Sequence, residues 1–489
     1  SAPAQAAAPT GTPEQRAAAL VAQMSREEKV AQAMNAAPAI PRLGIPAYEW
    51  WSEGLHGIAR NGYATVFPQA IGLAASWNTQ LMQQVGTVVS TEARAKFNQA
   101  GGPGKDHKRY AGLTIWSPNI NIFRDPRWGR GMETYGEDPF LTGQLAVGFI
   151  RGLQGDDLEH PRTIATPKHI AVHSGPEPGR HGFDVDVSPR DVEATYTPAF
   201  RAALVEGQAG SVMCAYNSLH GTPACAADWL LNGRVRGDWG FKGFVVSDCD
   251  AVDDMTQFHY FRPDNAGSSA ASLKAGHDLN CGTAYRALGT AIERGEVDEA
   301  LLDQSLVRLF AARYRLGELQ APRKDRYARL GAKDIDNAGN RALALQAAAE
   351  SIVLLKNANA TLPLKAGTRL AVIGPNAAIA RLGGYSGAPR HAVSLLDGVR
   401  AHLAGKAEVV HAQGVFITRS EDRSVDEVLL ADPAKNRALI ALITIVAAVV
   451  GGLALTNLKQ ELIPSLELPN LVVMTTYPGA SPEVVENDV

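Results

Sequence analysis

The stretch Phe241-Lys-Gly-Phe-Val-Val-Ser-Asp-Cys-Asp-Ala-Val-Asp253 decides how the rest of the chain is interpreted. Its apolar run, residues 244–246, has the length and β-branching of a buried strand, and it stops at Ser247 and Asp248. In a parallel α/β barrel the active site lies at the carboxyl ends of the strands, so an acid at that point is placed for chemistry. The alternative is that Asp248 only caps the helix that follows.

Three other segments repeat this pattern of a short apolar run followed by polar residues. Residues 163–166 lead to Lys168 and His169, residues 211–215 lead to Tyr216 and Asn217, and residues 275–279 lead to Asn280 and Cys281. Helical patterns separate these runs, as expected where strands and helices alternate. We therefore predict a TIM-type barrel with one polar ring over its mouth.

Composition limits the classes of function. The chain has 489 residues, 45% hydrophobic and 20% charged, with a formal net charge of −3, which suits a globular protein of more than one domain. A near-neutral charge without a basic run predicts no nucleic-acid partner, so a neutral substrate fits better. Neither a C-x-x-C pair nor a G-x-G-x-x-G or P-loop pattern is present, and we expect no metal and no cofactor.

The four cysteines, Cys214, Cys225, Cys249 and Cys281, all fall in the predicted barrel. Cys214 and Cys225 flank a turn-like stretch, and Cys249 and Cys281 each follow a predicted strand. Two disulfides, 214 to 225 and 249 to 281, would fit an oxidising compartment, whereas four buried thiols are the alternative. The Ala- and Pro-rich start of the chain resembles a mature N-terminus after signal cleavage, so we expect a periplasmic or secreted protein.

Two further segments carry candidate binding residues. In Tyr48-Glu-Trp-Trp-Ser-Glu-Gly-Leu-His-Gly57, aromatic residues surround Glu53, a combination that suits a sugar, although a core Trp pair with a surface Glu fits as well. Residues 115–139 hold Arg124, Arg127 and Arg130 in a Gly- and Pro-rich loop, where we expect at least one arginine to pair with Asp125 or Glu133.

Taken together, four motifs resemble glycoside hydrolase family 3 over about residues 12–440: Lys168-His169, Asp125-Pro-Arg-Trp-Gly-Arg130, Met213-Cys-Ala-Tyr-Asn217 and Gly243-Phe-Val-Val-Ser-Asp248. The variant with Trp50-Trp-Ser-Glu-Gly-Leu-His-Gly57 is similar to its β-glucosidase and β-xylosidase branch. The resemblance implies a barrel, an α/β sandwich domain and retaining exo-hydrolysis of β-linked sugars. It also implies that Asp248 is the nucleophile and that Glu53, Arg130, Lys168, His169 and Tyr216 line the sugar pocket.

The expected domains are the barrel over residues 1–330, a partial α/β sandwich over 340–437 and a tail over 438–489. Strand-like runs at 351–355 and 370–374 begin the second domain, and Gly383-Gly-Tyr-Ser-Gly387 is either a loop reaching the barrel mouth or a plain turn. In the tail, the apolar run that starts at Ala438 and ends at Leu455 is long enough for a membrane-spanning helix, with a buried core helix as the alternative.

The tail also contains Leu458-Lys-Gln-Glu-Leu-Ile-Pro464 and Thr476-Tyr-Pro-Gly-Ala-Ser-Pro-Glu483. With these motifs, the sequence from Asn436 onward instead resembles the N-terminal segment of a resistance-nodulation-division efflux transporter, which would make the chain chimeric and leave the sandwich domain incomplete. The family's acid/base Glu comes from the second domain, and none of Glu421, Glu427 and Glu461 lies in a matching motif. We therefore expect a β-glucosidase or β-xylosidase, acting on a β-linked oligosaccharide or aryl glycoside, impaired by loss of that Glu. The alternatives are a sugar-binding chain without catalysis and a membrane-associated transporter fragment.

Overall fold

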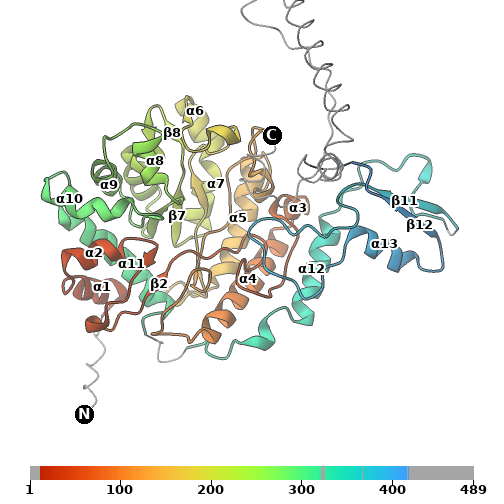
Figure 1. The fold of residues 1–489 in the computed structure, drawn as a ribbon, viewed down its shortest axis with the longest axis horizontal. Helices are drawn as coiled ribbons and strands as arrows, with labels where there is room; N and C mark the ends of the chain where they lie inside the picture. Colours follow the sequence, from red (N-terminus) through yellow and green to blue (C-terminus); the bar gives the residue numbers. More distant parts are fainter. Residues whose placement is uncertain (1–10, 321–324, 366, 416, 418–489) are drawn as a thin grey trace, which may run out of the picture. The chain divides into compact units, whose positions relative to one another are not determined.

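The computed structural model describes residues 11–320, 325–365, 367–415 and 417 (Figure 1). The described chain forms two compact units: the first contains residues up to 359 together with 382–392, and the second contains residues 360–381 and 393–415. The expected apolar helix from Ala438 to Leu455 lies outside the described residues. Among the helices that are described, none has both the length and the apolar character needed to cross a membrane.

Helices of the first unit begin at caps that the sequence encodes. Helix α1 (Pro13–Val21) follows Thr12, and helix α2 (Arg26–Gln32) follows Ser25. Each cap side chain accepts a hydrogen bond from the backbone N–H three residues later, and the Gln or Glu side chain at that position accepts one from the backbone N–H of the cap residue. The α-helices after these are α3 (Ala70–Ala74), α4 (Thr79–Gln99), α5 (Pro139–Gln154), α6 (Pro189–Asp191), α7 (Pro198–Arg201), α8 (Ala251–Gln257), α9 (Asn265–Lys274), α10 (Leu288–Glu293), α11 (Glu299–Leu316) and α12 (Ala338–Glu350). Wider π-helical turns include η4 (Val192–Tyr196), η5 (Ala202–Glu206) and η7 (Trp229–Asp238).

The centre of the first unit is a barrel-like ring of short parallel strands. Strands β10 (Phe244–Ser247), β7 (Ser211–Cys214) and β5 (Lys168–Ile170) form a sheet in that order, with Val245 beside Val212. Strand β3 (Thr114–Ile115) pairs with β4 (Ile164–Ala165), and β1 (Ala36–Ala37) pairs antiparallel with β2 (Tyr48–Glu49). Single parallel bridges connect these pieces: Met34 to Asn280, Leu279 to Val246, Lys168 to Asn119, and Ile115 to Ser52. A separate small sheet joins β6 (Asp184–Val185), β8 (Ser218–Leu219) and β9 (Thr222–Pro223).

Two of the four expected strands show details that the sequence did not predict. The run 163–166 is present as β4, and Lys168 and His169 follow it, but they lie within a further strand, β5, because the chain pairs a second time, with β7, after β4 ends at Ala165. The run 275–279 makes only single-residue bridges, at Leu279 and Asn280. Gly276 has a φ of +94°, far from extended geometry, so the backbone becomes extended only beyond it.

Helices pack closely around the ring. In Figure 1 helix α4 lies beside α5, and glycines make that approach possible. A Cβ placed on Gly152 would lie 2.1 Å from the carbonyl oxygen of Gln83, and one on Gly148 would lie 2.4 Å from that of Thr79. The helices therefore approach each other with backbone against backbone, which no larger residue at these positions would allow.

The second unit is built from α and β elements. Strands β11 (Arg369–Ile373) and β12 (Glu408–Ala412) pair in parallel, and α13 (Leu395–Leu403) lies between them in the sequence. The expected strand at 370–374 is thus present as β11, whereas 351–355 is not a strand. Ile352 and Leu355 are 79% and 91% exposed, and an apolar run becomes a strand only where a neighbour takes its backbone hydrogen bonds.

Candidate active site

Asp248 lies directly after β10, at the carboxyl end of the parallel sheet. Its backbone N–H donates to the carbonyl oxygen of Cys214 at 3.1 Å, and its Oδ1 accepts from the N–H of Cys249 at 2.9 Å. Its Oδ2 lies 3.4 Å from Arg130 Nη1 and 3.2 Å from His169 Nε2. The carboxylate is thus buried among cationic and polar groups, and its side chain retains 12% exposure.

His169 faces Asp248 with an unprotonated nitrogen. Its Nδ1 and its backbone N–H both lie within 2.9 Å of Asn121 Oδ1, so Nδ1 carries the ring proton of the neutral imidazole. Burial, assisted by the positive charge of Arg130, lowers the pKa of His169 well below its usual range. Nε2 is itself buried, has no hydrogen-bond donor among the described residues and lies 3.2 Å from Asp248 Oδ2.

Lys168 and Glu53, which are 115 residues apart in the sequence, form a buried ion pair. Lys168 Nζ lies 3.0 and 3.1 Å from the two Glu53 oxygens, and Trp51 Nε1 donates to Oε1 at 3.0 Å. Burial raises the pKa of Glu53, and Lys168 opposes that rise. The Trp51 ring stacks on Trp116 with centroids 5.6 Å apart. The sequence-predicted combination of aromatic faces beside a carboxylate is therefore assembled, and Glu53 is a buried residue.

The loop at residues 115–139 contains two separate arginine–carboxylate ion pairs. Arg127 binds Asp125 at 2.8 Å on the exposed side, whereas Arg130 binds Glu133 through two N–H groups, each at 2.9 Å. Burial lowers the pKa of Arg130, but the surrounding negative charge, that of Glu133 foremost, raises it more, so the pKa of Arg130 lies above its usual value. Both expected carboxylate partners thus hold an arginine, and only the Arg130 pair lies at Asp248.

Tyrosines complete the site. Tyr216, just beyond β7, is buried, and burial followed by the charge of Asp248 raises its pKa. Tyr385 comes from the loop 382–392, and Lys168 Nζ lies 4.8 Å from the centre of its ring. Backbone hydrogen bonds hold this loop against residues 60–64, including Ala64 N–H to Ala388 O at 3.1 Å. The loop therefore belongs to the first unit, and of the two interpretations the one that reaches the barrel mouth is correct.

All six sequence-predicted site residues therefore meet in one place: Glu53, Arg130, Lys168, His169, Tyr216 and Asp248. Sequence reasoning missed the contacts of Asn119 and Asn121, which hold Glu133 and His169. It considered Glu133 only as an arginine partner and Tyr385 only as part of a loop. The polar stretch that follows β3, Ser117 to Asn121, was the available signal, since it also lies at the carboxyl end of a strand.

The cysteines form both expected disulfides, Cys214–Cys225 and Cys249–Cys281. The second fixes the residue next to Asp248. His169 and His173 are four residues apart, a spacing that metal ligands also use, and their rings lie 5.1 Å apart. Within the described part of the chain, no group of His, Cys, Asp or Glu side chains is arranged to hold a metal ion.

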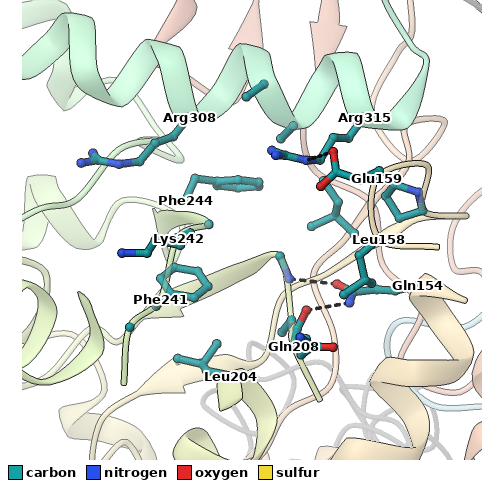
Figure 2. A pocket seen from close by; sticks show the side chains of 18 of the residues that line it. Gln154, Leu158, Glu159, Leu204, Gln208, Phe241, Lys242, Phe244, Arg308 and Arg315 are labelled. Atoms are coloured by element: carbon teal, nitrogen blue, oxygen red, sulfur yellow. Dashed lines mark hydrogen bonds and ion pairs between the residues drawn. The ribbon is translucent and has the colours of Figure 1, made fainter. Parts of the chain in front are cut away.

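A cavity of about 430 Å³ lies at the opposite end of the strands from Asp248. Its lining includes Phe244, the first residue of β10 (Figure 2). Ile164, the first residue of β4, also lines it. Its arginines are already paired: Arg308 binds Asp278 at 2.8 Å, and Arg315 binds Glu14 and Glu159. The arginines of this cavity are therefore occupied by carboxylates of the barrel base.

Comparison with known proteins identifies the family. The model of the glycosyl hydrolase family 3 N-terminal domain matches residues 16–312, and that of the C-terminal domain matches residues 352–463. The chain belongs to glycoside hydrolase family 3. The C-terminal match of this family continues past Asn436 and includes the run from Ala438 to Leu455, and no comparison supports a transporter segment there or a chimeric chain.

Family 3 relatives include β-xylosidases and β-glucosidases. A xylan 1,4-β-xylosidase of Xylanibacter ruminicola is 40% identical over 422 residues, which are 84% of this chain and 48% of the relative. A solved exo-β-xylosidase in complex with a xylobiose aziridine probe matches with a TM-score of 0.77 and 35% identity, over 83% of this chain and 54% of that chain. A Listeria innocua β-glucosidase in complex with glucose matches with a TM-score of 0.69 and 28% identity, over 86% of this chain and 62% of that chain. The chain spans about half the length of the curated relatives it matches.

Proposed function

We propose that this chain is a retaining, exo-acting β-glycosidase whose nucleophile is Asp248. The observation that carries the proposal is the Asp248 carboxylate, which follows a parallel strand and lies 3.4 Å from Arg130 and 3.2 Å from His169. Family membership supports hydrolysis of a terminal, non-reducing β-linked sugar. The xylosidase names of the curated relatives favour xylose, and the glucosidase structures, at lower identity, make glucose the alternative.

The chemistry follows from the carboxylate. An Asp248 oxygen attacks the anomeric carbon, the bond from that carbon to the leaving oxygen breaks, and the leaving group departs with the electron pair. Water then attacks the same carbon of the covalent intermediate and releases Asp248, so the configuration is retained after two inversions. Arg130 stabilises the ionised Asp248 carboxylate before the first step and again when the second step releases it.

The other side chains would bind the sugar. Glu53, already holding Lys168, presents acceptors for two hydroxyl groups, and Lys168 supplies N–H donors beside it. His169 Nε2 accepts a third hydroxyl. Tyr216 and Tyr385 offer ring faces and hydroxyl groups that bind the apolar and polar parts of the sugar.

Departure of a natural sugar alcohol also requires a proton. Of the described carboxylates around Asp248, Glu53 binds Lys168, Glu133 binds Arg130 and Asp254 binds His181, so none of these three is placed as a free acid. Glu421, Glu427 and Glu461 lie outside the described residues. We therefore propose that natural disaccharides react slowly, and the same observation favours the second candidate, a chain that binds sugar without hydrolysing it.

A substrate comparison tests this proposal. We expect covalent labelling of Asp248 and turnover with a dinitrophenyl β-xyloside, whose leaving phenolate needs no proton. Xylobiose should react more slowly by roughly 10²- to 10⁴-fold, the usual contribution of general acid catalysis, and azide should accelerate release from the intermediate. Sugar binding without any labelling would support the second candidate, and rapid xylobiose hydrolysis would mean that a proton donor is present.

The location proposed from the sequence, periplasmic or secreted, is supported by the two disulfides, which persist in oxidising compartments. Membrane association through the run from Ala438 to Leu455 stays a prediction. A vesicle flotation assay of the full chain would test it.

A further inference from the structure

Arg130 is shared unequally between two carboxylates. Its Nε and Nη2 both lie 2.9 Å from Glu133, one on each oxygen, whereas its Nη1 makes a single 3.4 Å contact with Asp248. A guanidinium fork fits one carboxylate at a time with two parallel bonds. Glu133 therefore holds the fork, and Asp248 receives only the N–H group that remains.

Glu133 is itself held firmly. It is 5% exposed, and Asn119 Nδ2 donates to its Oε2 at 3.1 Å. Its backbone N–H donates to the carbonyl oxygen of Arg130 at 3.0 Å, so both residues are parts of one short turn. Burial opposes ionisation of Glu133, but Arg130 outweighs it and lowers the pKa, so the carboxylate keeps its charge.

Asp248 is the acceptor that the fork would reach if Glu133 lost its charge, since Arg130 Nη1 already contacts it. A bidentate pair would engage both Asp248 oxygens, whereas nucleophilic attack needs one of them free. Strong hydrogen bonds to an attacking oxygen must also be weakened as that oxygen loses its negative charge in bonding to the anomeric carbon, which raises the barrier.

We propose that Glu133 is a positioning residue that keeps the Arg130 fork off Asp248 and so leaves the nucleophile free to attack. The proposal rests on the proposed function of Asp248 and deepens it. It assigns a role to a side chain that acts through Arg130.

The test uses Glu133→Gln in the full chain, which keeps the shape of the side chain and removes its charge. We expect a crystal structure of the variant to show Arg130 making two hydrogen bonds to Asp248. With a dinitrophenyl 2-deoxy-2-fluoro-β-xyloside, we expect the labelling rate constant to fall roughly 10- to 100-fold, the range found when residues that orient metal ligands are lost. The dissociation constant for xylose should change less than about threefold, because the hydroxyl-binding residues remain in place.

Glu318→Gln is the matched control. Glu318 also binds an arginine, Arg313, through two N–H groups at 2.6 and 3.0 Å, and both residues are buried. Its loss should leave the labelling rate constant of the folded protein unchanged. Glu133→Asp keeps a carboxylate for the fork and should label faster than Glu133→Gln; it replaces the Gln variant if that does not fold.

The possible outcomes separate the two hypotheses. If the parent chain is not labelled, the proposed function fails, and the crystal structure of the variant still decides whether Arg130 moves. If the parent is labelled and Glu133→Gln labels at the same rate, or if Arg130 keeps its single contact with Asp248, the positioning role is wrong. A parallel loss of labelling and xylose affinity would likewise overturn it, because that result indicates a general structural effect.

Discussion

Two buried arginine–glutamate pairs in the first unit have the same internal geometry and different surroundings. Arg130 with Glu133 and Arg313 with Glu318 each form two hydrogen bonds between one guanidinium and one carboxylate. The remaining N–H groups of Arg313 reach Gln32 Oε1 at 3.3 Å and Pro46 O at 3.0 Å, whereas that of Arg130 reaches Asp248.

The comparison shows that an ion pair is structural or functional according to what lies beyond it. Neutral acceptors of fixed position surround Arg313, so its pair stabilises the packing of the barrel. Arg130 faces a carboxylate that the proposed chemistry uses, so the same kind of pair there controls a reactive group. Each prediction below tests one side of this contrast.

The largest effect is expected at the reactive carboxylate. Asp248→Asn keeps the size of the side chain but removes the attacking charge, so labelling by an activated aryl glycoside should fall by at least about 10³-fold, because loss of a hydrolase nucleophile costs up to about 10⁶. Intact-mass spectrometry measures the covalent adduct over time. Unchanged labelling of the variant would exclude Asp248 as the nucleophile. It would also exclude a functional role for the Arg130–Glu133 pair that contacts it.

The structural pair should affect stability instead. Glu318→Gln leaves the Arg313 charge buried without a partner, and removal of one member of a buried pair costs about 3–5 kcal/mol of unfolding free energy. Urea denaturation measures this loss, and labelling under native conditions measures the chemistry. A tenfold fall in the labelling rate of the folded variant would mean that the two pairs do not differ as we infer.

The two disulfides allow a similar separation. Chain-entropy arithmetic gives about 3.7 kcal/mol for Cys249–Cys281, whose residues are 32 apart in sequence, and about 2.8 kcal/mol for Cys214–Cys225, which are 11 apart. Replacing both cysteines of a pair by serine should lower the unfolding free energy in that order. Only loss of the bond at Cys249, next to Asp248, should also slow labelling; equal effects of both pairs on labelling would contradict this.

The smallest effect concerns pH and a buried histidine away from Asp248. Burial lowers the pKa of His277 from 6.5 to about 4, so the unfolded chain takes up its proton first as the pH falls. Stability contributed by neutral His277 is complete above pH 6.5 and is lost on acidification between 6.5 and 4, by about 1.4 kcal/mol per pH unit. The variant His277→Gln should therefore show a shallower fall in unfolding free energy between pH 6.5 and 5.5. Identical slopes for parent and variant would exclude this titration.

Local signals in the sequence account for much of the first unit. Thr12 and Ser25 cap the first helices, Asp298 caps α11, and the runs at Phe244 and Ser211 form neighbouring parallel strands. These features depend on residues close together in the chain, where the spacing of apolar side chains and the presence of a cap are sufficient information. The position of Asp248 at a strand end follows from the same information.

Other features depend on partners that are remote in sequence. Lys168 lies within β5 because β7 is available to pair with it, and residues 351–355 lack such a neighbour in the described structure and form no strand. The loop carrying Tyr385 joins the first unit because its backbone bonds to residues 60–64. No property of either segment alone specifies these pairings.

The sequence by itself determined the family motifs, the predicted cysteine pairs and the residues available for chemistry. Only the tertiary structure decided how their charges are shared: that Glu53 holds Lys168, and that Glu133 takes the fork of Arg130 and leaves one N–H group for Asp248. The physical reason is that a buried charge is stabilised by whichever partner the fold brings within hydrogen-bonding distance. Tertiary packing sets that distance between residues far apart in the chain, such as Lys168 and Glu53, which are separated by 115 residues.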